Sequence, residues 1–284
     1  MTCLFCSIDK LDSFSKQTDR SGQDRHIYSC KNCGVLITSN RTVKEKIVNH
    51  LQGDVYKQKK YDRNDFIKDV NKDYFVLQEL KTHFTLMTGN ALDVGAHIGG
   101  FCYNLRGLGF ETYGLDIYND AVKFGVKNGE RIYLGDFPND IPEELLNKKY
   151  TIISFMESFY YLVDPKRSLL KVMELLDKGG YLLIQSINGL SNYYSNKNES
   201  YFIRYGDYVQ FIPNMKTFEY WLKEVGLDIV WATSLPSFKI NQIIKYSGPY
   251  NKLIKKIGLG INKIFSRNVS VDIADKIIIL AQKK

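Results

Sequence analysis

The stretch ALDVGAHIGG, residues 91–100, places three glycines and no proline directly after a short apolar run. Its first residues are predicted to end a buried strand that begins at residue 90, and a helix is predicted over residues 100–109. Glycine permits backbone torsions closed to other residues and lets a ligand lie against the main chain. A strand, a glycine loop and a helix in this order also point free N–H groups at an anionic group. The spacing differs from G-x-x-x-x-G-K-[ST], which argues against an NTPase.

Acidic residues stand where the next two predicted strands end. Asp116 closes the first of them and could accept hydrogen bonds from both hydroxyls of a ribose. Asp136, followed by Phe137, closes the second, where a carboxylate can bond an adenine amino group and a ring can stack on it. Strands are predicted over residues 111–117, 131–137 and 150–158, and a turn followed by a fifth strand within residues 177–185; a helix is predicted over residues 165–176. This alternation predicts a parallel sheet with helices on both faces.

On these motifs, residues 91–189 resemble the core of class I S-adenosylmethionine-dependent methyltransferases. Residues 93–99 resemble the first motif of that family, Asp116 its ribose acid, and residues 135–137 its adenine motif. The run LLKVMELLDKGGYLLI resembles the approach to its fifth strand. The resemblance implies a doubly wound, Rossmann-like α/β sheet of seven strands, completed near residues 227–233 and by an antiparallel strand, ADKIIILAQKK. It implies S-adenosyl-L-methionine as cofactor, held by Asp93, Gly95, Ala96, His97, Gly99, Asp116, Ile117, Gly135, Asp136, Phe137 and Met156.

Two positions depart from the family pattern. His97 stands where the family often has glycine. Its side chain either narrows the pocket or contacts the methionine carboxylate of the cofactor, or it faces solvent. Beyond the fourth strand the family often carries an acid–histidine pair, whereas this chain has Tyr160 and Tyr161. The obvious general base is therefore missing. Glu157 is the best base by position, although the family often uses this position for the cofactor, and Glu157 and Tyr161 are the candidate catalytic residues.

Four cysteines near the N-terminus form two C-x-x-C pairs. Cys3 and Cys6 make the first pair, and Cys30 and Cys33 the second. Such pairs predict a closed tetrahedral zinc site with a structural role; the alternatives are free thiols or a disulfide pair. The N-terminal segment also resembles the zinc ribbon fused to bacterial sugar and surface-polysaccharide methyltransferases. Cys102, the fifth cysteine, is expected to be a small buried residue.

The expected domains are a zinc ribbon over residues 1–40, a helical linker over 41–88 and a methyltransferase domain over 89–284. Within the linker, apolar residues at helical spacing predict helices over 42–51 and 65–84. Within that domain, residues 190–210 are rich in Tyr and Asn and resemble the variable substrate cover of the family. Tyr and Asn suit a sugar, although the same aromatic residues could instead close a core. The candidates for acceptor contacts are Tyr193, Tyr194, Tyr205, Asp207 and Tyr208.

The expected reaction is methyl transfer to a small molecule, a sugar or nucleotide-sugar hydroxyl in surface-polysaccharide or related biosynthesis. C-methylation is less favoured, because deoxysugar C-methyltransferases carry a further large C-terminal domain. One alternative is RNA methylation, and another is a non-catalytic module that binds the cofactor. Against RNA, the ribbon is not strongly basic and the fourth strand lacks an Asn/Asp-Pro-Pro-aromatic motif. No nucleic-acid partner is therefore expected, and the oligomeric state is left open.

The net charge of +8 comes from one end of the chain, because residues 1–238 contain 29 basic and 29 acidic side chains. A basic insertion is expected over residues 236–270, and within it residues 250–267 form an amphipathic pattern. Three roles are open for this segment. It covers the substrate cleft, it contacts an anionic membrane surface or a lipid-linked substrate, or it binds a protein partner. No apolar run reaches the roughly 20 residues that span a bilayer, and the N-terminus shows no signal peptide. A cytoplasmic location is expected, with peripheral contact at the inner face of the membrane as the alternative.

Overall fold

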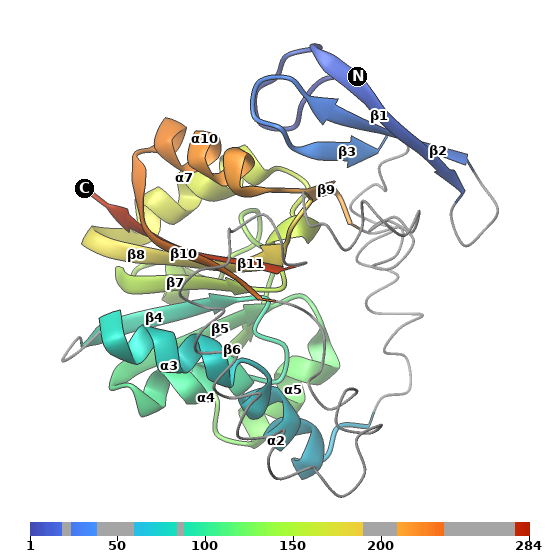
Figure 1. Ribbon diagram of the computed structural model, residues 1–284. Helices are drawn as coiled ribbons and strands as arrows, with labels where there is room; N and C mark the ends of the chain where they lie inside the picture. The colour runs from blue at the N-terminus through green and yellow to red at the C-terminus, as the bar shows by residue number, and fades with distance from the viewer. Residues whose placement is uncertain (19–23, 39–59, 84–87, 190–208, 236–275) are drawn as a thin grey trace, which may run out of the picture.

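The computed structural model describes residues 1–18, 24–38, 60–83, 88–189, 209–235 and 276–284. Within these residues the chain forms a seven-stranded sheet and a four-stranded sheet (Figure 1). The predicted helix over 42–51, the cover at 190–208 and the segment 250–267 lie outside the described residues. No helix in the described ranges is both long enough and apolar enough to cross a membrane.

The large sheet has the strand order β10-β11-β8-β7-β4-β5-β6. Its strands are β4 (Gly89–Val94), β5 (Phe110–Asp116), β6 (Ile132–Leu134), β7 (Tyr150–Met156), β8 (Leu176–Ile187), β10 (Leu227–Leu235) and β11 (Lys276–Lys283). Strand β4 pairs in parallel with β5 on one side and β7 on the other, so the strand order reverses there. Strand β11 runs antiparallel between β8 and β10. The predicted α/β sheet is confirmed, including its antiparallel last strand. In such a sheet ligands bind beyond the carboxyl ends of the strands at this reversal.

Helices cover both faces of the large sheet (Figure 1). They are α2 (Arg63–Lys72), α3 (Tyr74–His83), α4 (Gly100–Gly107), α5 (Asn119–Lys127), α6 (Glu143–Leu146), α7 (Pro165–Leu175) and α10 (Met215–Val225), with a short 3₁₀ turn η1 (Phe159–Tyr161). Strand residues alternate between two apolar clusters. Phe155 in β7 joins the cluster of Trp221 in α10, whereas its neighbour Met156 joins that of Leu105 in α4. Both faces are therefore buried, and β7 is apolar almost throughout.

Two predicted elements differ from the structure. The helix expected over 65–84 is two helices, because Asp73 breaks it between α2 and α3. Asp73 has φ −109° and ψ 23° and is 5% exposed. The strand expected over 131–137 ends at Leu134, since Asp136 pairs with Asp140 and turns the chain away from the sheet. Both breaks put carboxylates at the carboxyl edge of the sheet.

The N-terminal sheet joins the large domain through backbone and ring contacts. It contains β1 (Leu11–Thr18), β2 (Asp24–Cys30) and β3 (Leu36–Thr38), and its fourth strand is β9 (Phe211–Ile212), which precedes α10 in the chain. Phe5 stacks on Trp221 of α10, with ring centroids 4.9 Å apart and planes at 10°. Both rings belong to one apolar cluster. The N-terminal segment therefore shares a core with the domain that follows it.

Candidate functional site

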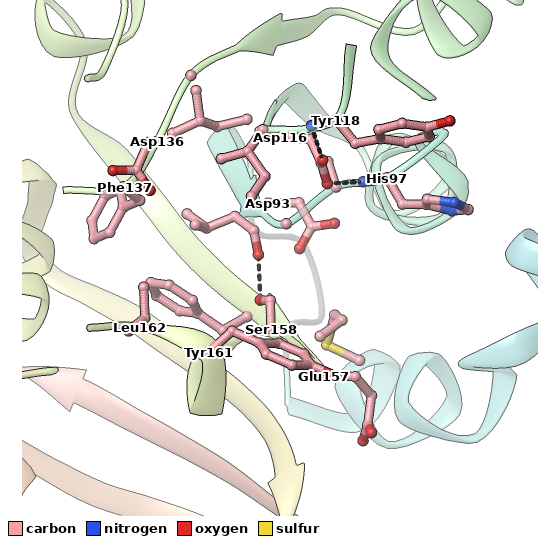
Figure 2. A pocket seen from close by; sticks show the side chains of 18 of the residues that line it. Asp93, His97, Asp116, Tyr118, Asp136, Phe137, Glu157, Ser158, Tyr161 and Leu162 are labelled. Atoms are coloured by element: carbon pink, nitrogen blue, oxygen red, sulfur yellow. Dashed lines mark hydrogen bonds between the residues drawn. The ribbon is translucent and has the colours of Figure 1, made fainter. Parts of the chain in front are cut away.

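A cavity of about 620 Å³ opens at the carboxyl ends of β4, β5, β6 and β7 (Figure 2). It lies at the reversal of strand order, where the topology predicts a ligand site. The sequence-predicted residues in its wall are Asp93, Gly95, Ala96, His97, Asp116, Ile117, Gly135, Asp136, Phe137, Met156, Glu157 and Tyr161. Of the residues expected to hold the cofactor, Gly99 alone does not line the cavity.

The glycine loop is tied to the neighbouring strand by its backbone. The N–H groups of Gly95 and Ala96 donate to the Leu115 carbonyl oxygen at 2.8 and 3.2 Å. Gly95 has φ +80°, and a Cβ there would lie 2.5 Å from Cβ of Ser158. Gly99 has φ +91° and precedes α4, where a Cβ would lie 2.8 Å from Cγ of Glu130. Gly95 therefore lets the loop pack against Ser158, whereas Gly99 lets the loop pack on the residues before β6.

His97 contacts two residues that precede the large sheet in the chain, Tyr61 and Asp69. Its Nε2 lies 2.8 Å from the Tyr61 hydroxyl, and its Nδ1 lies 3.7 Å from Oδ1 of Asp69. Its backbone has φ +52°, which is unfavourable for a residue with a Cβ. The sequence left two roles open for this side chain. In the structure His97 lines the cavity and its ring contacts Tyr61, a contact that sequence reasoning did not anticipate.

The two acids expected at the nucleoside end face the same cavity. The backbone N–H groups of His97 and Tyr118 donate to the Asp116 carboxylate at 2.7 and 2.8 Å, which fixes its orientation. Burial raises the pKa of Asp116. Asp136 accepts a hydrogen bond from Asn139 at 3.0 Å. Figure 2 shows Asp116 and Asp136 on one side of the crevice and Glu157 at the opposite end.

A group of charged side chains at the C-terminal end of α2 and at the break after it also lines the cavity, and sequence reasoning missed it. Its members are Asp69, Lys72 and Asp73. Burial opposes the charge of Lys72, yet the surrounding carboxylates, Asp73 first, leave its pKa raised. Burial raises the pKa of Asp73 as well. The signal was present in DVNKD, where acids four residues apart share a helix face, but these residues precede the motifs that carry the resemblance.

Asp93 lies beneath the glycine loop and is 2% exposed. The Ser154 hydroxyl donates to its Oδ1 at 2.7 Å. Burial raises the pKa of Asp93 to about 7. Its carboxyl group therefore titrates near neutrality in the wall of the cavity.

Glu157 is held by three neighbouring side chains. Its backbone has φ +60°, and its carboxylate oxygens accept from Gln185 at 3.1 Å and Tyr160 at 3.2 Å. Lys276 of β11 forms an ion pair with Oε1 at 3.2 Å. Tyr161 lines the cavity beside it. Ser186 and Asn188, further polar residues at the end of β8, are fully buried and do not line the cavity.

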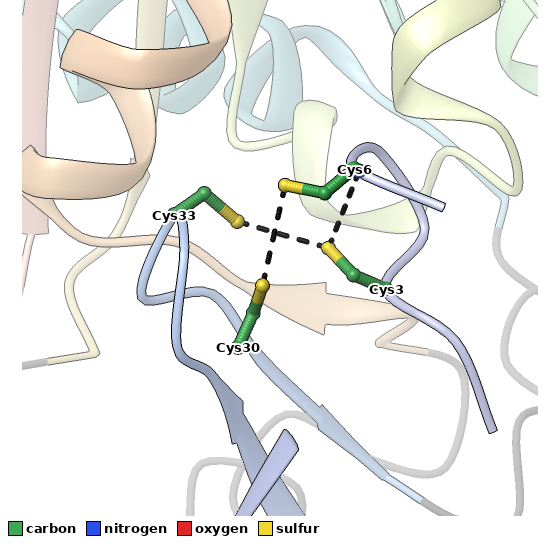
Figure 3. Close-up of side chains that lie close together, drawn as sticks. All are labelled: Cys3, Cys6, Cys30 and Cys33. Carbon is green, nitrogen blue, oxygen red and sulfur yellow. Dashed lines mark hydrogen bonds between the residues drawn. The ribbon is translucent and has the colours of Figure 1, made fainter. Parts of the chain in front are cut away.

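The four N-terminal cysteines form a second candidate site (Figure 3). Their sulfur atoms lie within 4.8 Å of one another, with 3.7 Å between Cys3 and Cys33 and 4.0 Å between Cys6 and Cys30. A tetrahedral zinc with Zn–S bonds of about 2.3 Å separates its sulfurs by about 3.8 Å. All five cysteines of the chain are free, so the disulfide alternative does not describe this structure. Cys102 is buried, as expected. The donor set fits a zinc ion.

The expected acceptor contacts lie outside the described residues. They are Tyr193, Tyr194, Tyr205, Asp207 and Tyr208. The structure therefore leaves them as predictions.

Comparisons with known proteins agree on the fold. A family model described as "Methyltransferase domain" matches residues 66–232, more than half of the chain. The chain is similar to a chain from the complex between the Haloferax volcanii Trm112 methyltransferase activator and a methyltransferase. The two chains share 14% identity and a TM-score of 0.54, and the match covers 85% of this chain and 99% of the other. It is also similar to the plantazolicin methyltransferase BamL, solved with S-adenosylhomocysteine, with 14% identity, a TM-score of 0.51 and coverage of 84% and 90%. A third similar structure is an S-adenosylmethionine-dependent methyltransferase from Archaeoglobus fulgidus, with 18% identity, a TM-score of 0.50 and coverage of 78% and 100%. No curated protein sequence matches the chain.

Proposed function

We propose a function from one premise: the chain belongs to the methyltransferase domain family. The activity supported by this membership and by the fold is S-adenosylmethionine-dependent methyl transfer. When bound, the cofactor supplies an electrophilic methyl group on a sulfonium. The chain then has to orient an acceptor, exclude water and remove a proton, and alignment alone contributes roughly 7–11 kcal/mol.

The residues of the cavity fit this cofactor. Asp116 would bind the ribose, because backbone N–H groups already orient its carboxylate. Asp136 and Phe137 would hold the adenine; the Phe137 ring packs edge-on against Phe155 at 5.5 Å, which limits its movement. Gly95 and Ala96 line the cavity, and the methionine end would lie along this loop. Asp93, beneath that loop, would compensate the charge of an ammonium group.

The acceptor is proposed to be a small sugar-like molecule with a hydroxyl group. The observation that carries this proposal is the charge of the cavity wall. Among the described residues of the wall, the acidic ones are Asp69, Asp73, Asp93, Asp116, Asp136, Glu157 and Asp164, and the basic ones are Lys72 and Arg167. Such a wall repels a polyanion such as RNA, whose binding needs clustered basic side chains. A nucleotide-sugar would have to keep its phosphates away from this wall.

The cysteine cluster is proposed to bind one structural Zn²⁺. Its sulfur spacing and the lack of a disulfide support this role. Asn32 Nδ2 and the backbone N–H of Cys6 point at cluster sulfurs at 3.5 Å, as donors to thiolate ligands do. All four protein ligands would be cysteines, so no position would remain for water or substrate.

Calorimetry with S-adenosylhomocysteine and S-adenosylmethionine tests the function. Wild type should bind both, and Asp116→Ala should weaken both. Transfer of a labelled methyl group to monosaccharides and nucleoside diphosphate sugars should then exceed transfer to RNA. If wild type binds neither cofactor nor product, the proposed activity is refuted. If only RNA is methylated, the proposed acceptor class is refuted.

A further inference from the structure

Two carboxylates from distant parts of the chain meet at one end of the cavity. Asp73 lies between α2 and α3, and Glu157 follows β7; both line the cavity. The side-chain amide of Gln185 in β8 donates to both, at 3.3 Å to Oδ1 of Asp73 and 3.1 Å to Oε1 of Glu157. This end lies over β7 and β8, on the far side of β4 from Asp136, which follows β6. A nucleoside bound at Asp116 and Asp136 would leave the carboxylate pair to the acceptor.

The two carboxylates have different surroundings. Both oxygens of Glu157 accept hydrogen bonds, and Lys276 neutralises its charge. Asp73 accepts one side-chain hydrogen bond within the described part of the chain, from Gln185, which leaves Oδ2 for another partner. Asp73 is 5% exposed. Glu157 is therefore held as a charged partner, whereas Asp73 can gain a proton.

The charged groups around Asp73 come from each element packed against it. They are Asp69 and Lys72 of α2, Asp93 of β4, Glu157 after β7 and Lys276 of β11. Burial is the largest influence and raises the pKa of Asp73; Lys72 and Lys276 oppose this, and Glu157 adds to it. A carboxylate that binds its proton more tightly than usual is a better base near neutral pH.

We propose that Asp73 is the general base that takes the proton of the acceptor hydroxyl, and that Gln185 and Glu157 position it. The inference rests on the proposed function. The acceptor oxygen forms a bond to the methyl carbon, the carbon–sulfur bond breaks with its electron pair remaining on sulfur, and the hydroxyl proton passes to Oδ2 of Asp73. The positive charge of the sulfonium and the negative charge of the carboxylate disappear together. This assignment replaces Glu157, the base expected from the sequence, with a residue that sequence reasoning missed.

The test compares full-length Asp73→Asn and Asp73→Glu with wild type. Asp228→Asn is the matched control, since its carboxylate is half exposed and pairs with Lys284 at the surface. Affinity for S-adenosylhomocysteine is measured by calorimetry. Methyl transfer to the sugar panel is measured against pH, and the Asp73 carboxyl carbon, assigned by its absence in Asp73→Asn, is titrated by ¹³C NMR.

We expect Asp73→Asn to keep product affinity within about threefold of wild type and to lose about 100-fold or more in kcat, the usual contribution of a general base. Asp73→Glu should recover part of the loss. In wild type the rate should rise with pH as Asp73 loses its proton, and Asp73→Asn should lack this rise. The NMR titration needs no acceptor, and Asp73 should titrate above the usual aspartate value of about 3.9.

Three results would overturn the proposal. The first is a kcat and pH profile of Asp73→Asn that match those of the Asp228→Asn control. The second is a tenfold or larger loss of product affinity in Asp73→Asn, which would assign Asp73 to the cofactor. The third is titration of the Asp73 carboxyl group at the usual aspartate value of about 3.9. Each leaves the methyltransferase activity standing, because wild type still binds the product. Failure of wild type to bind the product refutes the proposed function itself, and calorimetry on wild type detects it first.

Discussion

Gly95→Ala should damage both the stability of the chain and its cofactor site. Gly95 has φ +80°, a left-handed conformation that costs an L-residue about 1–2 kcal/mol. The new Cβ would lie 2.5 Å from Cβ and 2.9 Å from Oγ of Ser158, which is closer than real Cβ contacts. Ser158 therefore has to move.

The movement of Ser158 adds to the cost. Its hydroxyl donates to the Val94 carbonyl oxygen at 2.5 Å, and losing such a bond costs about 0.5–1.5 kcal/mol. Together with the backbone term, the free energy of unfolding should fall by about 1.5–3.5 kcal/mol. At about 2–4 °C per kcal/mol, that corresponds to a fall in Tm of about 3–14 °C. The displaced loop should also weaken S-adenosylhomocysteine binding by about tenfold or more, or 1.4 kcal/mol.

Thermal unfolding and calorimetry measure both effects. Gly107→Ala in α4 is the matched control, because a Cβ at Gly107 meets no atom within 4 Å and its φ is not positive. That variant should be as stable as wild type or more stable by up to about 1 kcal/mol, since alanine favours helix. If Gly95→Ala matches Gly107→Ala in Tm and in product affinity, the steric reasoning about the loop is refuted.

Three further predictions concern other parts of the molecule. Arg106→Met should lower the free energy of unfolding by about 3–5 kcal/mol in denaturant titrations. The reason is that Arg106 binds the fully buried Glu130 carboxylate at 2.7 and 2.8 Å, and the substitution leaves that carboxylate without its partner. Arg131→Met, at an exposed pair, should cost at most about 1 kcal/mol, and equal losses in the two variants would contradict the prediction. Folding raises the pKa of Asp93 to about 7 from 3.8, so the folded chain holds this proton more tightly and stability should fall as pH rises between those values. Asp93→Asn should make that fall smaller in denaturant titrations across the range, and an unchanged slope would show the assignment to be wrong. Phe5→Ala should lower the free energy of unfolding by about 3–5 kcal/mol, because it removes a buried ring that stacks on Trp221 of α10. The zinc content, measured by elemental analysis, should not change. A stability equal to that of wild type would show that the N-terminal segment does not share the core.

Local patterns in the sequence were sufficient for the α/β fold. Strands and helices alternate with apolar runs of the right period, and the loop at Gly95 needs a torsion that glycine adopts without strain. Asp116 could be assigned because it ends a strand next to that loop, and the edge of the sheet follows from strand order. The spacing of the C-x-x-C pairs also predicted a four-sulfur cluster, because each pair spans one tight turn.

The sequence by itself thus determined which segments form the sheet and which strand ends carry acids, because those properties depend on near neighbours in the chain. The tertiary structure alone decided that Asp73 lies beside Glu157, since their meeting depends on the break after α2 and on Gln185 from β8. It likewise decided that the N-terminal sheet takes its last strand from β9. No local periodicity encodes such contacts, because they arise only when the packed sheet brings distant segments together.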